Sequence, residues 1–414
     1  MLARVLTCVL YLVGLAWAGE SAPNIGAAGF QPTPAHPFGF RGDGTGRYTE
    51  ATPPLEWSSK KNVRWKTLVG KSYSSPTITD KLIFVTAEPN LLVCLNRADG
   101  TEKWKAEIKP TDLADEKSQT AAKEYTLPEP GSGMMAATPL TDGKAVYVAC
   151  SNGIFKAFDL EGKPKWIIYI DAEQNTSYGR SSTPILVDGK LILSMTNLYA
   201  FDPETGKQLW VNTDAKSAYG TPTVLKSGTQ NLIVTPGGDV VNVADGKTLN
   251  TGIGRCSNPS PVVSDGVVFF ADNAIKAVRL NAAFKDEEVW SNEIKGDVFG
   301  SPLVHNGLMY MATGMGQLVA YNVNGKGTPD PVINARELFP DEAGGEPLIY
   351  SSLSLAGNHL FLSTLRGETL VFEATKEAKQ VGKNVLPEGG GGTPIFSGKE
   401  VFIRDGKNLF CIGE

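Results

Sequence analysis

The segment Ser182–Trp210, STPILVDGKLILSMTNLYAFDPETGKQLW, decides the fold of this chain. It begins Ser-Thr-Pro and runs through a short apolar stretch to an Asp-Gly turn at Asp188. Apolar side chains then alternate along Lys190–Ser194 and again before Asp202, and a Gly-containing turn leads to the final Trp. Alternation with period two between such turns predicts four antiparallel strands. The proline fits the head of the first strand, because that position need not donate to the ladder.

The same pattern recurs at eight places along the chain. Successive copies start 63, 45, 38, 39, 41, 51 and 41 residues apart, and most of these steps match the length of one four-stranded propeller blade. The first step contains an insertion, residues 109–133, in which Asp112–Tyr125 is expected to form a short helix capped by Thr111 or Asp112. The residues that mark the copies are Pro76, Pro139, Pro184, Pro222, Pro261, Pro302, Leu353 and Pro394.

The last copy stops after three strands, and a spare strand of the fourth type, Asn62–Leu68, lies before the first copy. We therefore predict an all-β, eight-bladed β-propeller of four-stranded antiparallel blades over residues 62–414, closed by an N-terminal strand that completes the last blade. Such closure removes the open edges of a linear array. Residues 19–61 are rich in Pro and Gly and lack periodicity, so an ordered coil over the propeller, or partial disorder, is expected there.

The first residues indicate export. Arg4, the apolar run Val5–Leu15 and the small-x-small site Ala16–Ala18 predict a signal peptide over residues 1–18. The run is too short to span a bilayer, and no comparable run follows, so no transmembrane segment is expected in the mature chain. The protein is accordingly expected in the periplasm or outside the cell, as a monomer.

Charge and cysteine usage exclude some classes of function. The net charge is −5, and cleavage would remove Arg4 and no acidic residue, leaving about −6. Because a nucleic-acid surface needs clustered positive charge, no nucleic-acid partner is expected. Four cysteines remain without metal-type spacing; most lie within apolar alternation typical of the core, and whether any of them pair stays open. These residues are Cys94, Cys150, Cys256 and Cys411.

The turn before the last strand of each copy resembles the tryptophan-docking motif of propellers with pyrroloquinoline-quinone (PQQ) repeats. It reads AFDPETGKQLW over Ala200–Trp210, and the resemblance covers roughly residues 40–414. In that family the ring packs flat between blades against the Gly of the docking turn, and burial of such a ring contributes a few kcal/mol. Copies four, six and seven lack the Trp and must be packed otherwise. The docking residues implied are Trp65, Trp104, Trp166, Trp210 and Trp290.

The resemblance points to two kinds of protein. Quinoprotein alcohol dehydrogenases bind PQQ and calcium on the propeller axis, whereas the propeller lipoprotein of the outer-membrane β-barrel assembly machinery is a non-catalytic scaffold. This chain is closer to the second, because it lacks the adjacent-cysteine disulfide and large insertions of the enzymes and has few carboxylates for calcium or for a base. We expect no catalytic residue, metal or cofactor, and a protein or peptide partner in the envelope.

The mouth of the central channel is the expected binding site, because loops from all blades converge there. Aromatic rings and two arginines on these loops suit a flat anionic ligand, although rings that simply plug the channel fit equally. One alternative is a compact PQQ- and calcium-dependent dehydrogenase of alcohols or sugars, with Arg180 or Arg255 on the quinone carboxylates and Asp297 as a speculative base; a carbohydrate-binding propeller is another. The predicted mouth residues are Tyr73, Arg180, Tyr219, Arg255, Asn258, Phe299 and Tyr350.

Overall fold

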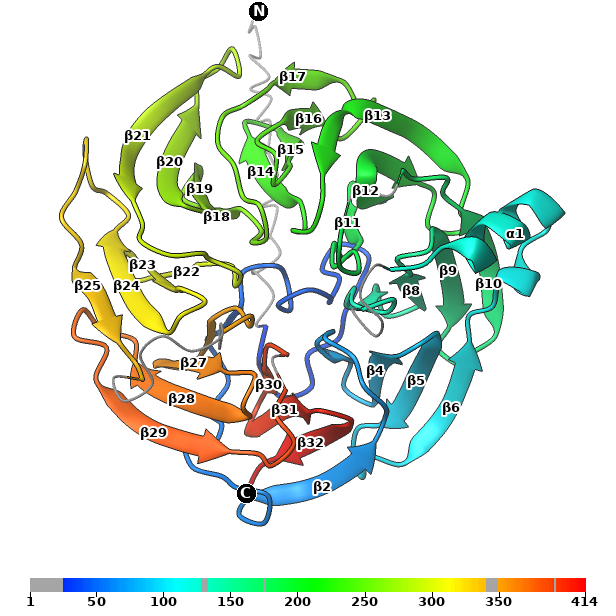
Figure 1. Ribbon diagram of the computed structural model, residues 1–414, viewed down its shortest axis with the longest axis horizontal. Coiled ribbons are helices and arrows are strands. Elements are labelled where there is room, and N and C mark those ends of the chain that lie inside the picture. The colour runs from blue at the N-terminus through cyan, green and yellow to red at the C-terminus, as the bar shows by residue number, and fades with distance from the viewer. Residues whose placement is uncertain (1–24, 128–132, 174–175, 340–348, 391) are drawn as a thin grey trace, which may run out of the picture.

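The computed structural model describes residues 25–414 except 128–132, 174–175, 340–348 and 391. The predicted signal peptide lies outside the described residues. Within them, eight antiparallel sheets surround a central axis as the blades of a propeller, which confirms the predicted fold (Figure 1). The apolar core consists of side chains packed between neighbouring blades.

The strands of the first four blades follow the chain in order. Blade one contains β3 (Thr77–Ile78), β4 (Leu82–Ala87), β5 (Leu91–Asn96) and β6 (Glu102–Glu107). Blade two contains β7 (Leu140–Thr141), β8 (Ala145–Ala149), β9 (Ile154–Asp159) and β10 (Pro164–Tyr169). Blade three contains β11 (Ile185–Val187), β12 (Lys190–Phe201) and β13 (Gln208–Ser217), and β12 supplies both middle strands. Blade four contains β14 (Thr223–Ser227), β15 (Gln230–Val234), β16 (Val240–Asn242) and β17 (Thr248–Asn250).

The remaining blades complete the ring. Blade five contains β18 (Val262–Ser264), β19 (Val267–Ala271), β20 (Ala274–Leu280) and β21 (Asp286–Glu293). Blade six contains β22 (Leu303–His305), β23 (Leu308–Ala312), β24 (Gln317–Asn322) and β25 (Ile333–Glu337). Blade seven contains β26 (Ser354–Ala356), β27 (His359–Ser363), β28 (Glu368–Glu373) and β29 (Gln380–Val385). Blade eight contains β30 (Ile395–Ser397), β31 (Glu400–Asp405), β32 (Asn408–Ile412) and β2 (Val63–Leu68).

The ring is closed by the predicted pairing of its two ends. Strand β2 runs antiparallel to β32, with Trp65 opposite Cys411 and Leu68 opposite Asn408. In Figure 1 the blue β2 forms the outer strand of the red blade. Because β2 pairs with β32, the edge of β32 is covered and blade eight has four strands like the other complete blades.

The N-terminal segment, residues 25–58, covers one face of the ring. Strand β1 (Arg47–Tyr48) adds in parallel to β26 and gives blade seven a fifth strand. Further along, Phe38 exchanges backbone hydrogen bonds with Thr141 of blade two, and the N–H of Thr52 donates to Gly398 of blade eight at 2.8 Å. These contacts lie at the turns between the first and second strands, so we call this side the hairpin face. The opposite side, built from the loops that lead into the first strands, is the mouth face.

The insertion after blade one contains the predicted helix with a different start. A short 3-10 helix, η1 (Pro110–Asp112), precedes α1 (Glu116–Glu124). The N-cap is Asp115, whose side chain accepts from the N–H of Ser118 at 2.8 Å, so the predicted cap at Thr111 or Asp112 is wrong. Those residues are instead taken up by η1. No helix among the described residues has the length and apolar character needed to cross a membrane.

A ring of hydroxyl groups explains the Ser or Thr that precedes each marker residue. In each of seven links, the N–H of this residue donates to the hydroxyl of its counterpart in the next blade, at 2.8–3.2 Å. The eighth link closes the ring differently, because the Ser75 hydroxyl donates to the Thr393 carbonyl at 3.0 Å. We call this ring the hydroxyl belt. Its members are Ser75, Thr138, Thr183, Thr221, Ser260, Ser301, Ser352 and Thr393.

Candidate functional site

Five tryptophans lie between successive blades, and each indole N–H donates to a backbone carbonyl of the following blade at 2.9–3.1 Å. Four of the rings also rest on the glycine of the following docking turn. A Cβ built on that glycine would lie only 2.5–2.7 Å from the ring, so no other residue could occupy the position without displacing it. The pairs are Trp65 with Gly100, Trp104 with Gly162, Trp166 with Gly206 and Trp210 with Gly246.

Blade seven receives its tryptophan from another part of the chain. Gly382 of β29 stands opposite Val371, the position that corresponds to the docking tryptophan in other blades. Trp57 of the N-terminal segment stacks on Phe361 of the same blade, with ring centroids 6.2 Å apart. The backbone N–H of Trp57 donates to the side-chain oxygen of Asn384 at 2.6 Å, and Trp57 is only 4% exposed. The N-terminal segment therefore fills a gap that the repeat itself leaves open.

Blade four departs from the pattern on both sides of its interface. Asn250 of β17 occupies the position of the docking tryptophan, and its side-chain amide donates to the Phe284 carbonyl at 2.9 Å. Phe284 takes the place of the docking glycine in the next turn and adopts φ of 59°. The chain thus replaces the tryptophan and its glycine together, and a hydrogen bond takes over from ring packing.

The mouth face carries a set of exposed apolar side chains on well-anchored loops. Tyr73, Tyr178 and Tyr350 are 56%, 57% and 45% exposed. Phe299 stacks on Tyr350 with ring centroids 4.5 Å apart, and the Tyr219 hydroxyl accepts from the N–H of Tyr178 at 3.4 Å. The hydroxyl belt lies just beyond these loops in the chain and fixes their ends. Aromatic rings presented on rigid backbone are suited to contact a partner surface.

Two of these side chains were missed by sequence reasoning. Tyr178 lies six residues before the marker Pro184, whereas most of the predicted mouth residues lie three residues before their marker. Met315, 43% exposed, belongs to the turn between β23 and β24 rather than to a loop that leads into a first strand. The turn between β23 and β24 lies beside the loop that leads into β26, because the N–H of Ile349 donates to the Gly314 carbonyl at 3.2 Å. This turn therefore also reaches the mouth face. The signal for Met315 was its place between two glycines in a second-to-third-strand turn.

The two predicted arginines lie in different environments. Arg180 is 3% exposed, and its guanidinium donates to the carbonyls of Ser151 and Glu173, each at 2.6 Å, while resting on the Tyr125 ring. It thus holds loops together beneath the surface. Arg255 is 79% exposed in its side chain and lies 4.0 Å from Asp272. The structure does not bring these two guanidinium groups to one accessible point.

The other predicted residues lie on the loops of the mouth face. Asp297 is exposed, and its backbone carbonyl accepts from Gly314 at 2.8 Å. Asn258 is half-buried beside the belt residue Ser260. No group of three or more His, Cys, Asp or Glu side chains that could hold a metal ion occurs within the described part of the chain.

A half-buried carboxylate, Glu88, supports the mouth face at blade one. Glu88 accepts from the N–H of Met135 at 2.9 Å, and Arg404 lies close enough to act on its charge. Burial raises the pKa of Glu88, while the Met135 and Met134 N–H groups and Arg404 act in the opposite direction. Arg404 itself donates to the carbonyls of Thr86 and Gly70. These contacts join blade one to blade eight rather than reaching toward a ligand.

All four cysteines are buried free thiols. Burial raises the pKa of Cys94, Cys150 and Cys256 to about 12, which disfavours the reactive thiolate.

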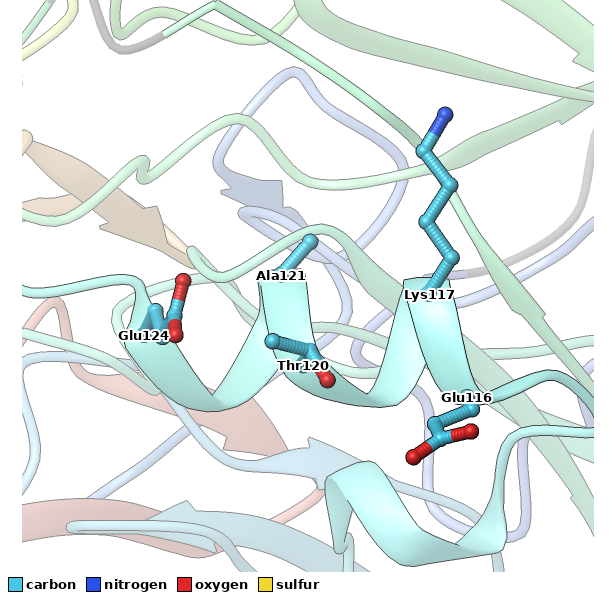
Figure 2. Close-up of a pocket in the computed structure, with 5 residues that line it drawn as sticks. All are labelled: Glu116, Lys117, Thr120, Ala121 and Glu124. Carbon is cyan, nitrogen blue, oxygen red and sulfur yellow. The ribbon is translucent and has the colours of Figure 1, made fainter.

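Figure 2 shows a hollow on α1 lined by five residues of this one helix, in which Lys117 points away from Glu116. Neither the buried cysteines nor the hollow on α1 brings together an acid, a base or a nucleophile in the way that a catalytic site does.

Several solved structures share the fold of this chain. BamB from Moraxella catarrhalis matches with a TM-score of 0.59 and 10% identity over 84% of this chain and 97% of that one. Quinohemoprotein alcohol dehydrogenase from Comamonas testosteroni matches with a TM-score of 0.58 and 12% identity, over 88% of this chain and 79% of that one. The computationally designed Ika8 protein gives 0.57 and 9%, over 85% and 99%. Such low identities show the fold alone.

Sequence comparison is more decisive. No curated protein matches this chain significantly. The profile of the family described as outer membrane protein assembly factor BamB, however, matches residues 57–250 and 236–328, which together span well over half of the 414 residues. The matched range includes all five docking tryptophans and the first five blades. The chain therefore belongs to the PQQ-type propeller family described as outer membrane protein assembly factor BamB.

Proposed function

We propose that this chain is an exported, non-catalytic binding module that holds a protein or peptide partner in the cell envelope. The mouth face is the surface that it uses, and no PQQ or metal ion takes part. Family membership supports a role beside other proteins, since the family is described as an assembly factor. The observation that carries the proposal is the set of exposed tyrosines, Tyr73, Tyr178 and Tyr350, on loops of one face fixed by the hydroxyl belt.

Physical considerations favour a macromolecular partner. Exposed tyrosines on ordered loops lose little conformational entropy on binding and bury a large ring each, so a few of them can dominate an interface. The charged groups beneath the face are already engaged: Arg180 by carbonyls and Glu88 by backbone N–H groups. The face thus offers apolar contact and hydrogen bonding from phenol groups, with Arg255 as an accessible cation.

Site-specific photo-crosslinking in envelope preparations of the host tests the proposal. A photoreactive residue at Tyr73, Tyr178 or Tyr350 should give a discrete crosslinked protein, whereas the same probe at Leu209, an exposed residue of the outer strand β13, should not. Replacing the three tyrosines together with serine should weaken binding of the identified protein at least tenfold, and Leu209→Ser should leave it unchanged. Equal crosslinking at all sites, or unchanged affinity in the triple variant, would contradict the proposal.

The dehydrogenase alternative has its own test. The purified protein is titrated with PQQ in the presence of calcium, and reduction of a dye by alcohols or sugars is followed. We expect neither saturable tight binding nor dye reduction. Saturable binding with turnover that is lost in Asp297→Asn would replace the binding-module proposal with an enzymatic one.

A further inference from the structure

Arg41 occupies an unusual position within the N-terminal segment. It adopts φ of 53° at the turn Gly39–Gly42, a region that non-glycine residues seldom occupy. Although the segment crosses the centre of the hairpin face (Figure 1), Arg41 is only 1% exposed. Its Nη2 donates to the carbonyl of Leu353 at 3.0 Å. Leu353 directly follows Ser352 of the hydroxyl belt, so the guanidinium points inward along the first strand of blade seven.

The remaining donors of this guanidinium have no acceptor in the described part of the chain. Nε and Nη1 of Arg41 are buried, and neither has a hydrogen-bond partner among the described residues. The same holds for the hydroxyl of Tyr48, which is fully buried. Tyr48 and Arg41 are near enough for the charge state of each to influence the pKa of the other. Three buried donors in one neighbourhood are costly unless an acceptor satisfies them.

The charge of Arg41 is compensated only from a distance, because Asp43 acts on it without forming an ion pair. No ion pair joins Arg41 to a carboxylate within the described ranges. The nearby Asp43 is exposed, and its Oδ1 accepts from the N–H and hydroxyl of Thr45 within its own turn. Burial lowers the pKa of Arg41 to about 10, so the group remains a cation at neutral pH. A buried cation of this kind is expected to be neutralised by an opposite charge.

Other buried arginines of the ring show what Arg41 lacks. Arg97 forms an ion pair with Glu400 at 2.7 Å and donates to the Thr79 carbonyl. Arg404 makes two carbonyl contacts and has Glu88 nearby. Arg41 has one carbonyl contact, and the carboxylate that acts on its charge is the exposed Asp43. The cradle around it is tight, because a Cβ on Gly46 would lie 2.6 Å from Nη2. A bulky ligand therefore does not fit.

We propose that Arg41 and Tyr48 form a binding site for one small inorganic anion of halide size, between the N-terminal segment and blade seven. The anion accepts hydrogen bonds from Nε and Nη1 of Arg41 and from the Tyr48 hydroxyl, and it supplies the missing negative charge. It thereby joins the N-terminal segment to the inner strands of the ring. This site lies on the opposite face from the proposed partner surface, and it is independent of that function.

Bromide diffraction tests the site in the unaltered protein. Crystals of the mature chain grown with bromide as the halide are measured at the bromine absorption edge. We expect an anomalous peak within about 3.5 Å of Nε or Nη1 of Arg41, the range of hydrogen-bonded contacts to large acceptors. Density for water alone at this position, or a carboxylate of the chain in its place, would overturn the proposal.

Stability measurements provide a second readout. The melting temperature is compared in sodium chloride and in an equal concentration of a salt whose anion is too large for the site, such as sodium gluconate. Wild type should melt higher in chloride by a few degrees, since a ligand that binds only the folded state stabilises it. Arg41→Met should abolish the difference, and Arg47→Met, a half-buried arginine of the same segment, should retain it. Should wild type show no chloride-specific shift, or Arg41→Met retain it, the site does not exist.

Discussion

Blades one and seven fill the same position with tryptophans from different parts of the chain. In blade one the ring belongs to the outer strand: Trp104 stands opposite Cys94 and packs on Gly162 of the next blade. In blade seven the outer strand has Gly382 at that position, and Trp57 of the N-terminal segment lies against Phe361. The comparison shows that the propeller requires the ring between blades, whichever segment supplies it.

The reason lies in the construction of blade eight. The third-to-fourth-strand turn that would receive a tryptophan from blade seven does not exist there, because β32 ends the chain and β2 comes from its beginning. The N–H of Gly413 donates to Asn62 across this break at 2.8 Å. The segment that leads into β2 is already in place, so it can carry the ring that closes the gap.

The largest expected effect comes from removing a docking ring that belongs to its own blade. Trp290 is fully buried and packs against Tyr321 of the next blade. Trp290→Ala should lower the free energy of unfolding by about 3–5 kcal/mol, because a large cavity forms between two blades. Chemical denaturation followed by circular dichroism measures this loss. A loss below about 1 kcal/mol would mean that neighbouring side chains collapse into the space.

Removing the ring supplied by the N-terminal segment should cost somewhat less. Trp57→Ala is expected to destabilise by about 2–4 kcal/mol, since the cavity lies under a segment that can relax. Hydrogen exchange should rise in β29 and in residues 51–58 while blade two stays protected. If protection fell equally in all blades, Trp57 would serve the whole ring rather than its own interface.

The interface between blades four and five allows the reverse experiment. Asn250→Trp alone should destabilise, because Phe284 occupies the space that a docking glycine leaves free in other blades. Combining it with Phe284→Gly should recover stability, with a coupling free energy of about 1–2 kcal/mol in a double-mutant cycle. Additive effects of the two substitutions would show that the tryptophan and glycine are not a transferable pair.

The smallest expected effect concerns the hydroxyl belt, to which blade three and blade seven contribute Thr183 and Ser352. Thr183→Val keeps the side-chain volume and removes the acceptor of the Thr138 N–H. We expect a loss of about 1–2 kcal/mol from one unsatisfied buried donor. Ser352→Ala in blade seven should cost a similar amount, since Ser301 loses the same contact. A difference of more than about 2 kcal/mol between the two would contradict an equal contribution from each blade.

Most of the fold could be predicted from the sequence, because each blade repeats the same turns and alternation. Closure by β2 followed from counting strands, with Trp65 as the marker. The role of Trp57 could not be predicted, since it lies in a segment without periodicity and Gly382 gives no signal of a missing ring. Likewise, nothing in the alternation around Arg180 distinguishes a guanidinium held by carbonyls from one at the surface. The sequence assigns each candidate residue to a loop, whereas the burial of a single side chain depends on packing between loops.

The pairing of β2 with β32 also bears on how the molecule folds. Trp65 and Cys411 are partners from opposite ends of the chain, and contacts of such long sequence separation slow the search for the native state. Individual blades can form from local hairpins, whereas the last sheet must wait until both of its distant segments are present. The late step is then the joining of these two strands, and until it occurs their exposed edges are the place where chains are most apt to associate wrongly.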